Sequence, residues 1–141
     1  MDLTSPAIKL CLESIHAEFE GRVADARALS LQAWQAVTDD YEACVAAHYL
    51  AGCQATPEAT LQWHQEALDR ANKADPEQVK SFYPSLYVNL GRAHEVLGHE
   101  AEARRYYALA AQLGLVHEPD PGTAEALSTA RPSRCESELM D

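Results

Sequence analysis

Apolar residues recur every three to four positions through most of the chain, a spacing typical of helices that bury one face. In the first segment Ile8, Leu12, Ile15 and Phe19 follow this spacing and predict one continuous apolar face. β-Branched residues are scarce, whereas Ala, Leu, Glu, Gln and Arg are abundant, which is the composition of helices. The pattern therefore predicts an all-α protein without a sheet.

Capping residues mark where the helices begin. Ser5, Thr56 and Asp75 each place a side-chain oxygen before a proline, whose missing N–H is harmless at the first helical position. Asp39 and Glu42 resemble a capping box, in which each side chain accepts a hydrogen bond from the other residue's backbone. We therefore expect helices to start at or just after these caps.

Glycines mark where the helices end. Four of them follow apolar-periodic runs, where a left-handed residue commonly ends a helix, namely Gly21, Gly52, Gly98 and Gly114. Starts and ends together predict six helices over residues 6–20, 22–37, 40–51, 57–74, 76–97 and 99–113. Because the connections are short, consecutive helices should run antiparallel and form three hairpins.

Pro84 falls inside the predicted helix 76–97. A proline in a helix interior removes a backbone hydrogen bond, so it either kinks the helix or separates its first turns from the rest. In the second case Ser81 is placed to cap the chain again, and the helix begins near that residue. The sequence leaves both alternatives open.

The chain changes character after the last predicted helix. Residues 118–122 form a turn cluster, residues 123–131 fit one short helix, and residues 132–141 are polar without periodicity. We therefore predict a helical domain over residues 1–116, followed by a turn, a short helix and a flexible tail over residues 117–141. Deleting the chain from Pro132 onward is expected to leave stability nearly unchanged.

The third hairpin carries a more specific spacing. Its first helix contains Tyr87-x-x-Leu90-Gly91-x-x-His94, and its turn and second helix contain Gly98, Ala103, Tyr107 and Ala110. This order resembles the tetratricopeptide repeat, Trp-x-x-Leu-Gly-x-x-Tyr followed by Ala-x-x-x-Phe. Small residues at these positions let two helices approach closely, and we expect Ala103 opposite Gly91.

The resemblance weakens toward the N-terminus. The first hairpin repeats the turn glycine and two alanines at Gly21, Ala26 and Ala33, but Glu13-Ser14 stands where the motif has Leu-Gly. The middle hairpin is the most degenerate. The resemblance therefore covers all three hairpins with unequal strength, and it implies a right-handed superhelix of about three repeats.

Charge restricts the expected partners. Twenty-two acidic and eleven basic residues give a formal net charge of −11, which disfavours nucleic acid and anionic membranes. Basic peptides or basic protein surfaces fit better. The chain shows no signal peptide, no apolar stretch of the ~20 residues needed to span a membrane, and four cysteines without disulfide-framework spacing. We therefore expect a cytoplasmic protein.

Two groups of residues invite a metal or catalytic interpretation. His94 and His99 are one residue too far apart for a zinc-protease motif. On one continuous helix their side chains would point about 140° apart, and Gly98 breaks that helix.

Cys44 and His48 lie one helical turn apart, and Cys53 and His64 would complete a set of metal ligands. However, buried Cys and packed His side chains are common in proteins without a metal. No phosphate loop, nucleophile elbow or dinucleotide fingerprint is present. We expect no catalysis, no cofactor and no metal.

The resemblance also implies where a partner binds. In the family, the first helix of each hairpin lines a concave groove that receives a peptide or a partner helix. It assigns to this groove Ser85, Val88, Asn89, Arg92 and Glu95 from the fifth helix, and Tyr41, Cys44, Val45 and His48 from the third. The expected function is protein or peptide binding as an adaptor or regulatory subunit. A homodimer formed through an apolar terminal face is the first alternative, and an enzyme or small-ligand sensor the second.

Overall fold

All regular structure is helical in the computed structural model, which describes residues 4–114. Seven α-helices and one 3₁₀ turn follow one another, namely α1 Pro6–Phe19, α2 Val23–Ala36, α3 Asp40–Ala51, α4 Pro57–Lys73, α5 Pro76–Val79, η1 Lys80–Phe82, α6 Tyr83–Val96 and α7 Glu100–Gln112. The all-α prediction is confirmed for these residues. The turn, short helix and tail predicted over residues 117–141 lie outside the described range.

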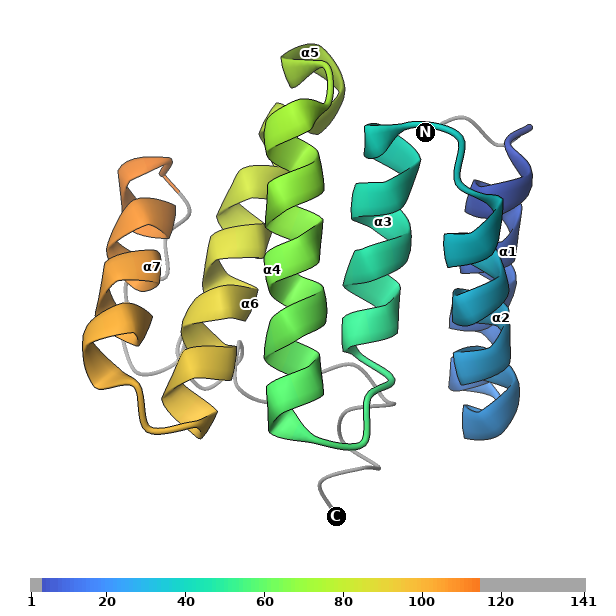
Figure 1. The fold of residues 1–141 in the computed structure, drawn as a ribbon, viewed down its shortest axis with the longest axis horizontal. Helices are drawn as coiled ribbons and strands as arrows, with labels where there is room; N and C mark the ends of the chain where they lie inside the picture. Colours follow the sequence, from blue (N-terminus) through green and yellow to red (C-terminus); the bar gives the residue numbers. More distant parts are fainter. Residues whose placement is uncertain (1–3, 115–141) are drawn as a thin grey trace.

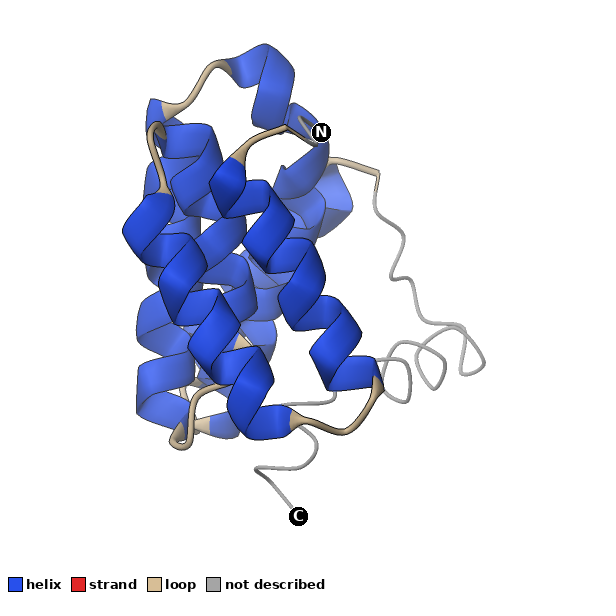
Figure 2. Ribbon diagram, turned by 90° about the vertical axis from the view of Figure 1, so that its right-hand side faces the viewer, coloured by secondary structure: helices blue, strands red, loops and turns tan. Residues whose placement is uncertain are grey.

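The long helices pack as three adjacent pairs, α1 with α2, α3 with α4 and α6 with α7 (Figure 1). Between the pairs, α3 contacts both α1 and α2, and α4 contacts α6. In the view turned by 90°, the α1–α2 pair stands in front of the others (Figure 2). The three predicted hairpins are therefore present, and they stack along the long axis of the molecule.

The predicted caps begin their helices. Ser5 Oγ, Asp39 Oδ1 and Thr56 Oγ1 each accept a hydrogen bond from the backbone N–H three residues on, at 3.3, 2.8 and 3.2 Å. The capping box at Asp39 closes on one side only. The Glu42 carboxylate instead accepts the backbone N–H of Thr38 at 3.0 Å and the hydroxyl of Ser5 at 2.8 Å.

Helices end at all four predicted glycines, but only three of these glycines have the expected left-handed conformation. Gly21, Gly98 and Gly114 have φ values of 81°, 81° and 77°, in the left-handed region. Gly52 has φ −71° and continues the right-handed conformation of α3. The chain therefore turns toward α4 through residues after Gly52.

The predicted helix 76–97 is interrupted. The 3₁₀ turn η1 separates the four-residue helix α5 from α6, and Pro84 is the second residue of α6, where its missing N–H breaks no hydrogen bond. Of the two alternatives that the sequence left open, the separation of the first turns is the one found. Ser81 is not the cap, because α6 starts at Tyr83 and its preceding residue makes no side-chain capping bond.

The first and third hairpins share one turn geometry. Each turn contains a left-handed glycine, and the residue after it donates its N–H at 2.9 Å to the carbonyl five residues earlier (Arg22 to Ala17, and His99 to His94). This is the hydrogen-bond pattern of a Schellman helix end. The spacing repeat seen in the sequence is thus also a repeat of backbone structure.

Within the third hairpin, α6 and α7 are in tight contact at Gly91. A Cβ atom on Gly91 would lie 2.7 Å from the ring of Tyr107, so this ring covers the glycine. Ala103 is buried as well, but the atoms nearest to that Cβ position belong to Tyr107, a residue that the sequence did not place against Gly91. In the first hairpin the equivalent residues, 77 positions earlier, are Ser14 and Ser30, whose hydroxyls are 2.7 Å apart.

Gly91→Val should therefore lower the free energy of unfolding by about 1–3 kcal/mol, because the new side chain collides with Tyr107. Helix propensity alone would favour the replacement, since glycine is the poorest helix former after proline. Urea denaturation measures the change. Adding Tyr107→Ala to Gly91→Val should recover part of the loss, and additive losses in the double variant would show that the two residues do not touch.

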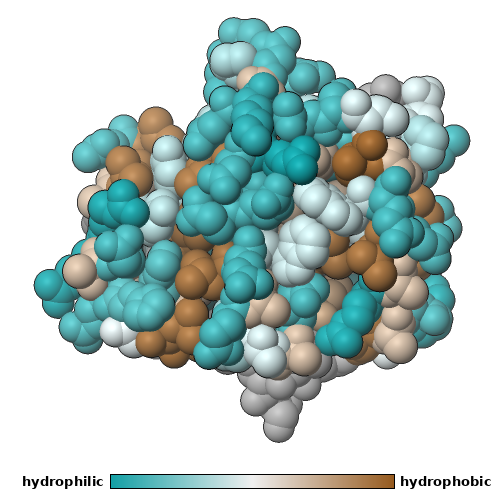
Figure 3. Space-filling view, viewed as in Figure 1, coloured by the Kyte–Doolittle hydropathy of each residue, from teal (hydrophilic) through white to brown (hydrophobic). Residues whose placement is uncertain are grey.

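The predicted apolar face of α1 is only partly covered. Ile8 is fully buried, but Leu12 is 40% exposed and Phe19 71% exposed. Within residues 4–114, the first hairpin lies at one end of the stack, and no further helix pair packs on its outer side. On the face drawn in Figure 3, polar residues cover α5 and much of α4, and apolar patches lie beside them. The expectation of one continuous buried face on α1 is wrong for these two side chains.

Candidate partner-binding groove

A groove of about 180 Å³ lies between α3 and the chain from η1 to α6. Apolar and polar side chains line it together, namely Cys44, Val45, His48, Tyr49, Ser81, Phe82, Ser85 and Leu86. Both helices are the first of their hairpins. The groove contains four of the predicted partner-binding residues, namely Cys44, Val45, His48 and Ser85.

One wall of the groove was missed by sequence reasoning. Ser81 and Phe82 come from the 3₁₀ turn, which forms because the chain is interrupted before Pro84. The Phe82 ring stacks on Tyr41 with centroids 6.0 Å apart. Tyr41, another predicted site residue, is itself buried in the core, so it supports the wall rather than facing the opening. The only indication of this wall in the sequence was Pro84, which the sequence left as either a kink in one helix or a break before it.

A polar group adjoins the groove at His48. The Asn89 Nδ2 atom lies 3.5 Å from His48 Nδ1, and Arg92 Nη2 donates at 3.1 Å to Asn89 Oδ1. Asn89 is only 5% exposed, whereas the other two side chains are half-buried. Asn89 therefore positions His48 and Arg92, and these two are the side chains accessible to a ligand.

The remaining predicted residues of α6 do not line this groove. Val88 is half-buried, and the exposed Glu95 accepts the hydroxyl of Tyr107 on α7 at 2.8 Å. Burial, and then this bond to Glu95, raise the pKa of Tyr107 above the ordinary phenol value. Glu95 is therefore tied to the α6–α7 contact.

The Cys44 thiol, which lines the groove, is unreactive near neutral pH. Burial raises the pKa of Cys44 to about 11, so the thiol stays protonated near neutral pH. A protonated thiol is a poor nucleophile and a poor metal ligand. Among residues 4–114, no three His, Cys, Asp or Glu side chains gather closely enough to hold a metal ion. Cys44 therefore supplies no thiolate to the groove near neutral pH.

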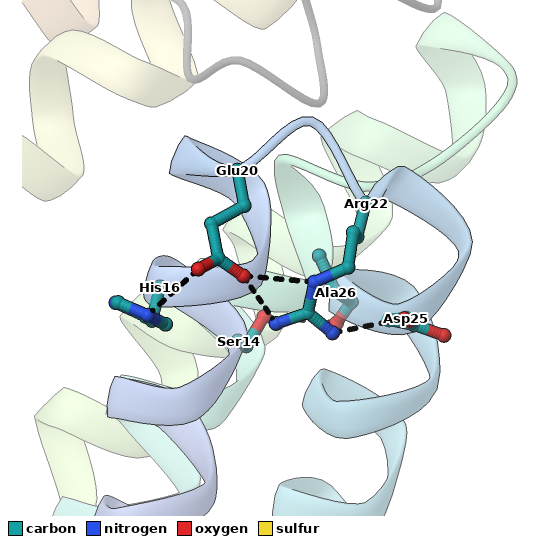
Figure 4. A network of polar contacts seen from close by, with 6 residues as sticks. All are labelled: Ser14, His16, Glu20, Arg22, Asp25 and Ala26. Carbon is teal, nitrogen blue, oxygen red and sulfur yellow. Dashed lines mark hydrogen bonds and ion pairs between the residues drawn. The ribbon is translucent and has the colours of Figure 1, made fainter.

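A second, wider hollow of about 580 Å³ lies on the first hairpin, between α1 and α2. Three of its lining side chains belong to one network of ion pairs (Figure 4): Arg22 pairs with Glu20 at 2.7 Å and with Asp25 at 2.9 Å, and His16 lies 3.1 Å from Glu20. The hydrogen bond from Arg22, followed by the charge of His16, lowers the pKa of the Glu20 carboxyl. Because these groups already satisfy each other, the groove at α3 and α6 is the stronger candidate.

His94 and His99 meet at the turn between α6 and α7. Their Nδ1 atoms are 3.0 Å apart, so the expectation that the two side chains diverge is wrong. That expectation assumed one straight helix, whereas the left-handed Gly98 turns the chain and brings His99 back over the last turn of α6. The zinc-protease spacing is nevertheless absent.

Comparison with protein-family models, curated proteins and solved structures finds no match to this chain. Among residues 4–114, no helix is long and apolar enough to cross a membrane.

Proposed function

We propose that this chain is a peptide-binding protein of the tetratricopeptide type, and that it holds an extended segment of a partner protein in the groove between α3 and α6. The observation that carries this proposal is the lining of that groove. Apolar Val45 and Phe82 lie beside polar His48 and Ser85, on the first helices of two successive hairpins and on the 3₁₀ turn before α6. Such a mixture gives a side-chain pocket together with hydrogen-bonding groups for a peptide backbone.

The size of the groove favours a peptide side chain over a free small molecule. Its volume of about 180 Å³ is below the roughly 300–1,000 Å³ of pockets that enclose small ligands. A peptide needs to bury only one side chain there, while its backbone continues along α6 toward Arg92. Arg92 then offers a guanidinium for a carbonyl or carboxylate of the partner.

The charge of the protein favours a basic or neutral partner segment. A net charge of −11 steers basic ligands inward and repels acidic ones. Added salt screens this attraction, so association should slow as ionic strength rises. A single carboxylate on an otherwise basic peptide would still pair with Arg92.

Ser85→Arg is expected to weaken peptide binding by at least ~10-fold, because a long charged side chain would fill the groove. Peptides selected from a random display library on the full chain serve as probes, with affinity measured by fluorescence anisotropy. Ala108→Arg, at an exposed position on α7 outside the groove, adds the same charge and should bind like the parent. Equal affinity of the Ser85→Arg variant and the parent would contradict the groove assignment.

Arg92→Ala should weaken the same peptides by about 1–3 kcal/mol, the usual effect of removing a charged hydrogen-bond donor from an interface. The substitution should spare the fold, because Arg92 is half-buried and its described bond runs to a side chain of the same helix. Circular dichroism checks the fold and anisotropy checks binding. Unchanged affinity would place the ligand away from this end of α6.

Self-association is a second candidate function, favoured by the uncovered apolar side chains of the first hairpin. Leu12 and Phe19 on α1 and Leu31 on α2 are all exposed. A two-fold contact between two such hairpins would cover them. Sedimentation of the full chain and of Phe19→Glu tests this candidate: a dimer that the substitution dissociates supports it, and a monomeric parent excludes it.

A further inference from the structure

The turn between α6 and α7 holds two imidazoles in a geometry that a metal ion can use. The Nδ1 atoms of His94 and His99 face each other at 3.0 Å, and the ring centroids are 5.3 Å apart. His94 is half-buried and His99 is exposed, so the pair opens to solvent on one side. Neither residue lines the proposed peptide groove.

We propose that His94 and His99 form a two-histidine chelate for a divalent transition-metal ion of the Ni²⁺ or Cu²⁺ type. Imidazole nitrogen is a ligand that both ions prefer. This site is separate from the peptide groove and does not depend on the function proposed for that groove.

The separation of the two nitrogens is compatible with chelation of one metal ion. With metal–nitrogen bonds of about 2.0–2.1 Å, nitrogens 3.0 Å apart subtend an angle of roughly 91–97° at the metal. That angle is close to the 90° between neighbouring ligands in square-planar or octahedral coordination, which Cu²⁺ and Ni²⁺ adopt.

The structure holds the pair in place before any metal arrives. The left-handed Gly98 and the bond from the His99 N–H to the His94 carbonyl fix the turn. The His94 ring lies parallel to Tyr106, with centroids 5.6 Å apart and an interplanar angle of 8°. Arg105 covers Tyr106 at 4.7 Å, so the ring that supports His94 is itself held. Little side-chain freedom remains to be lost on chelation.

Nearby groups shift the pKa of His94 both upward and downward. Burial, followed by the charge of His99, lowers the pKa of His94, and Arg105 acts in the same direction, whereas Glu102 raises it. Glu102 pairs with Arg105 at 2.9 Å, so its carboxylate lies close to the chelate without being one of its ligands.

Metal binding requires a tautomer change. In the metal-free pair one Nδ1 carries the proton and the other accepts it, because two bare nitrogens or two N–H groups would repel. When both Nδ1 atoms bind metal, the first ring must carry its proton on Nε2, and solvent transfers it there. No net proton is released while both rings are neutral. Water or a group from a partner completes the coordination.

Isothermal titration of the full, tag-free chain with Ni²⁺ and with Zn²⁺ tests the proposal. We expect Ni²⁺ to bind more tightly than Zn²⁺, and His99→Gln to weaken Ni²⁺ binding at least ~10-fold. His94→Phe should weaken it equally while keeping a ring to stack on Tyr106. His16→Gln removes a surface histidine outside the pair and should bind Ni²⁺ like the parent.

A second readout locates the metal. Ni²⁺ is paramagnetic, so it should broaden the nuclear magnetic resonance signals of His94, His99 and Tyr106 before any others. Unchanged affinity in His99→Gln, which is exposed and should not disturb the fold, would overturn the proposal. Broadening centred on other residues, or Zn²⁺ binding as tight as Ni²⁺ binding, would overturn it as well.

Discussion

Leu90→Ala is expected to lower the free energy of unfolding by about 2–5 kcal/mol, one of the two largest effects predicted for this protein. The Leu90 side chain is completely buried (0% exposed) in the main hydrophobic cluster, which joins residues of α1, α2, α3, α4, α6 and α7. Truncation removes its apolar contacts and leaves a cavity, because neighbouring backbones relax only partly. Urea denaturation followed by circular dichroism measures the loss.

Leu31→Ala is the matched control for this substitution. Leu31 also lies within a long helix, so both changes alter helix propensity equally, but it is 45% exposed. Its replacement should change stability by no more than about 0.5 kcal/mol. Similar losses at the two positions would mean that α6 does not pack into the common core.

The helix boundaries could be predicted because their signals are local. Ser5, Asp39 and Thr56 cap helices through atoms only three residues away, so the sequence alone contains both partners. The interruption before Pro84 could not be predicted, because both alternatives satisfy the proline locally. Tertiary contacts accompany the one that is found: Val79 is fully buried at the end of α5, and Phe82 stacks on Tyr41.

The candidate site, like the helix boundaries, could be predicted only in part. The resemblance to the tetratricopeptide repeat assigned His48 and Ser85 to one surface, and in the structure both side chains line the groove between α3 and α6. Spacing alone does not report depth, so it gave no warning that Asn89 is buried beneath Arg92. Helical spacing also failed to predict that the side chains of His94 and His99 meet, because the left-handed Gly98 redirects the chain between them. Contacts formed across a turn or between hairpins depend on geometry that periodicity does not encode.

Glu42 shows the same limit at the junction of the first two hairpins. The sequence predicts a local capping role for it beside Asp39. In the structure its buried carboxylate accepts the hydroxyl of Ser5 at 2.8 Å, and the N–H and hydroxyl of Thr38 at 3.0 and 3.1 Å. Ser5 caps α1 with the same oxygen atom. Glu42 therefore joins the start of α1 to the start of α3, and this contact helps to set how the first hairpin packs on the second.

Glu42→Ala should accordingly lower the free energy of unfolding by about 2–4 kcal/mol. Three hydrogen bonds to a charged acceptor are lost, and the buried Ser5 hydroxyl is left without this acceptor, whereas alanine adds only a small gain in helix propensity. Glu42→Gln keeps the shape and one carbonyl oxygen, so it should lose less than half as much. Glu13→Ala, which removes an exposed glutamate on α1, controls for the loss of one negative charge and should leave the stability nearly unchanged.

Denaturation of Ser5→Ala and of the Ser5→Ala/Glu42→Ala double variant completes a double-mutant cycle, in which the double variant should lose less stability than the sum of the two single losses. Strict additivity would mean that Glu42 stabilises α3 alone and that the two hairpins are joined by apolar packing.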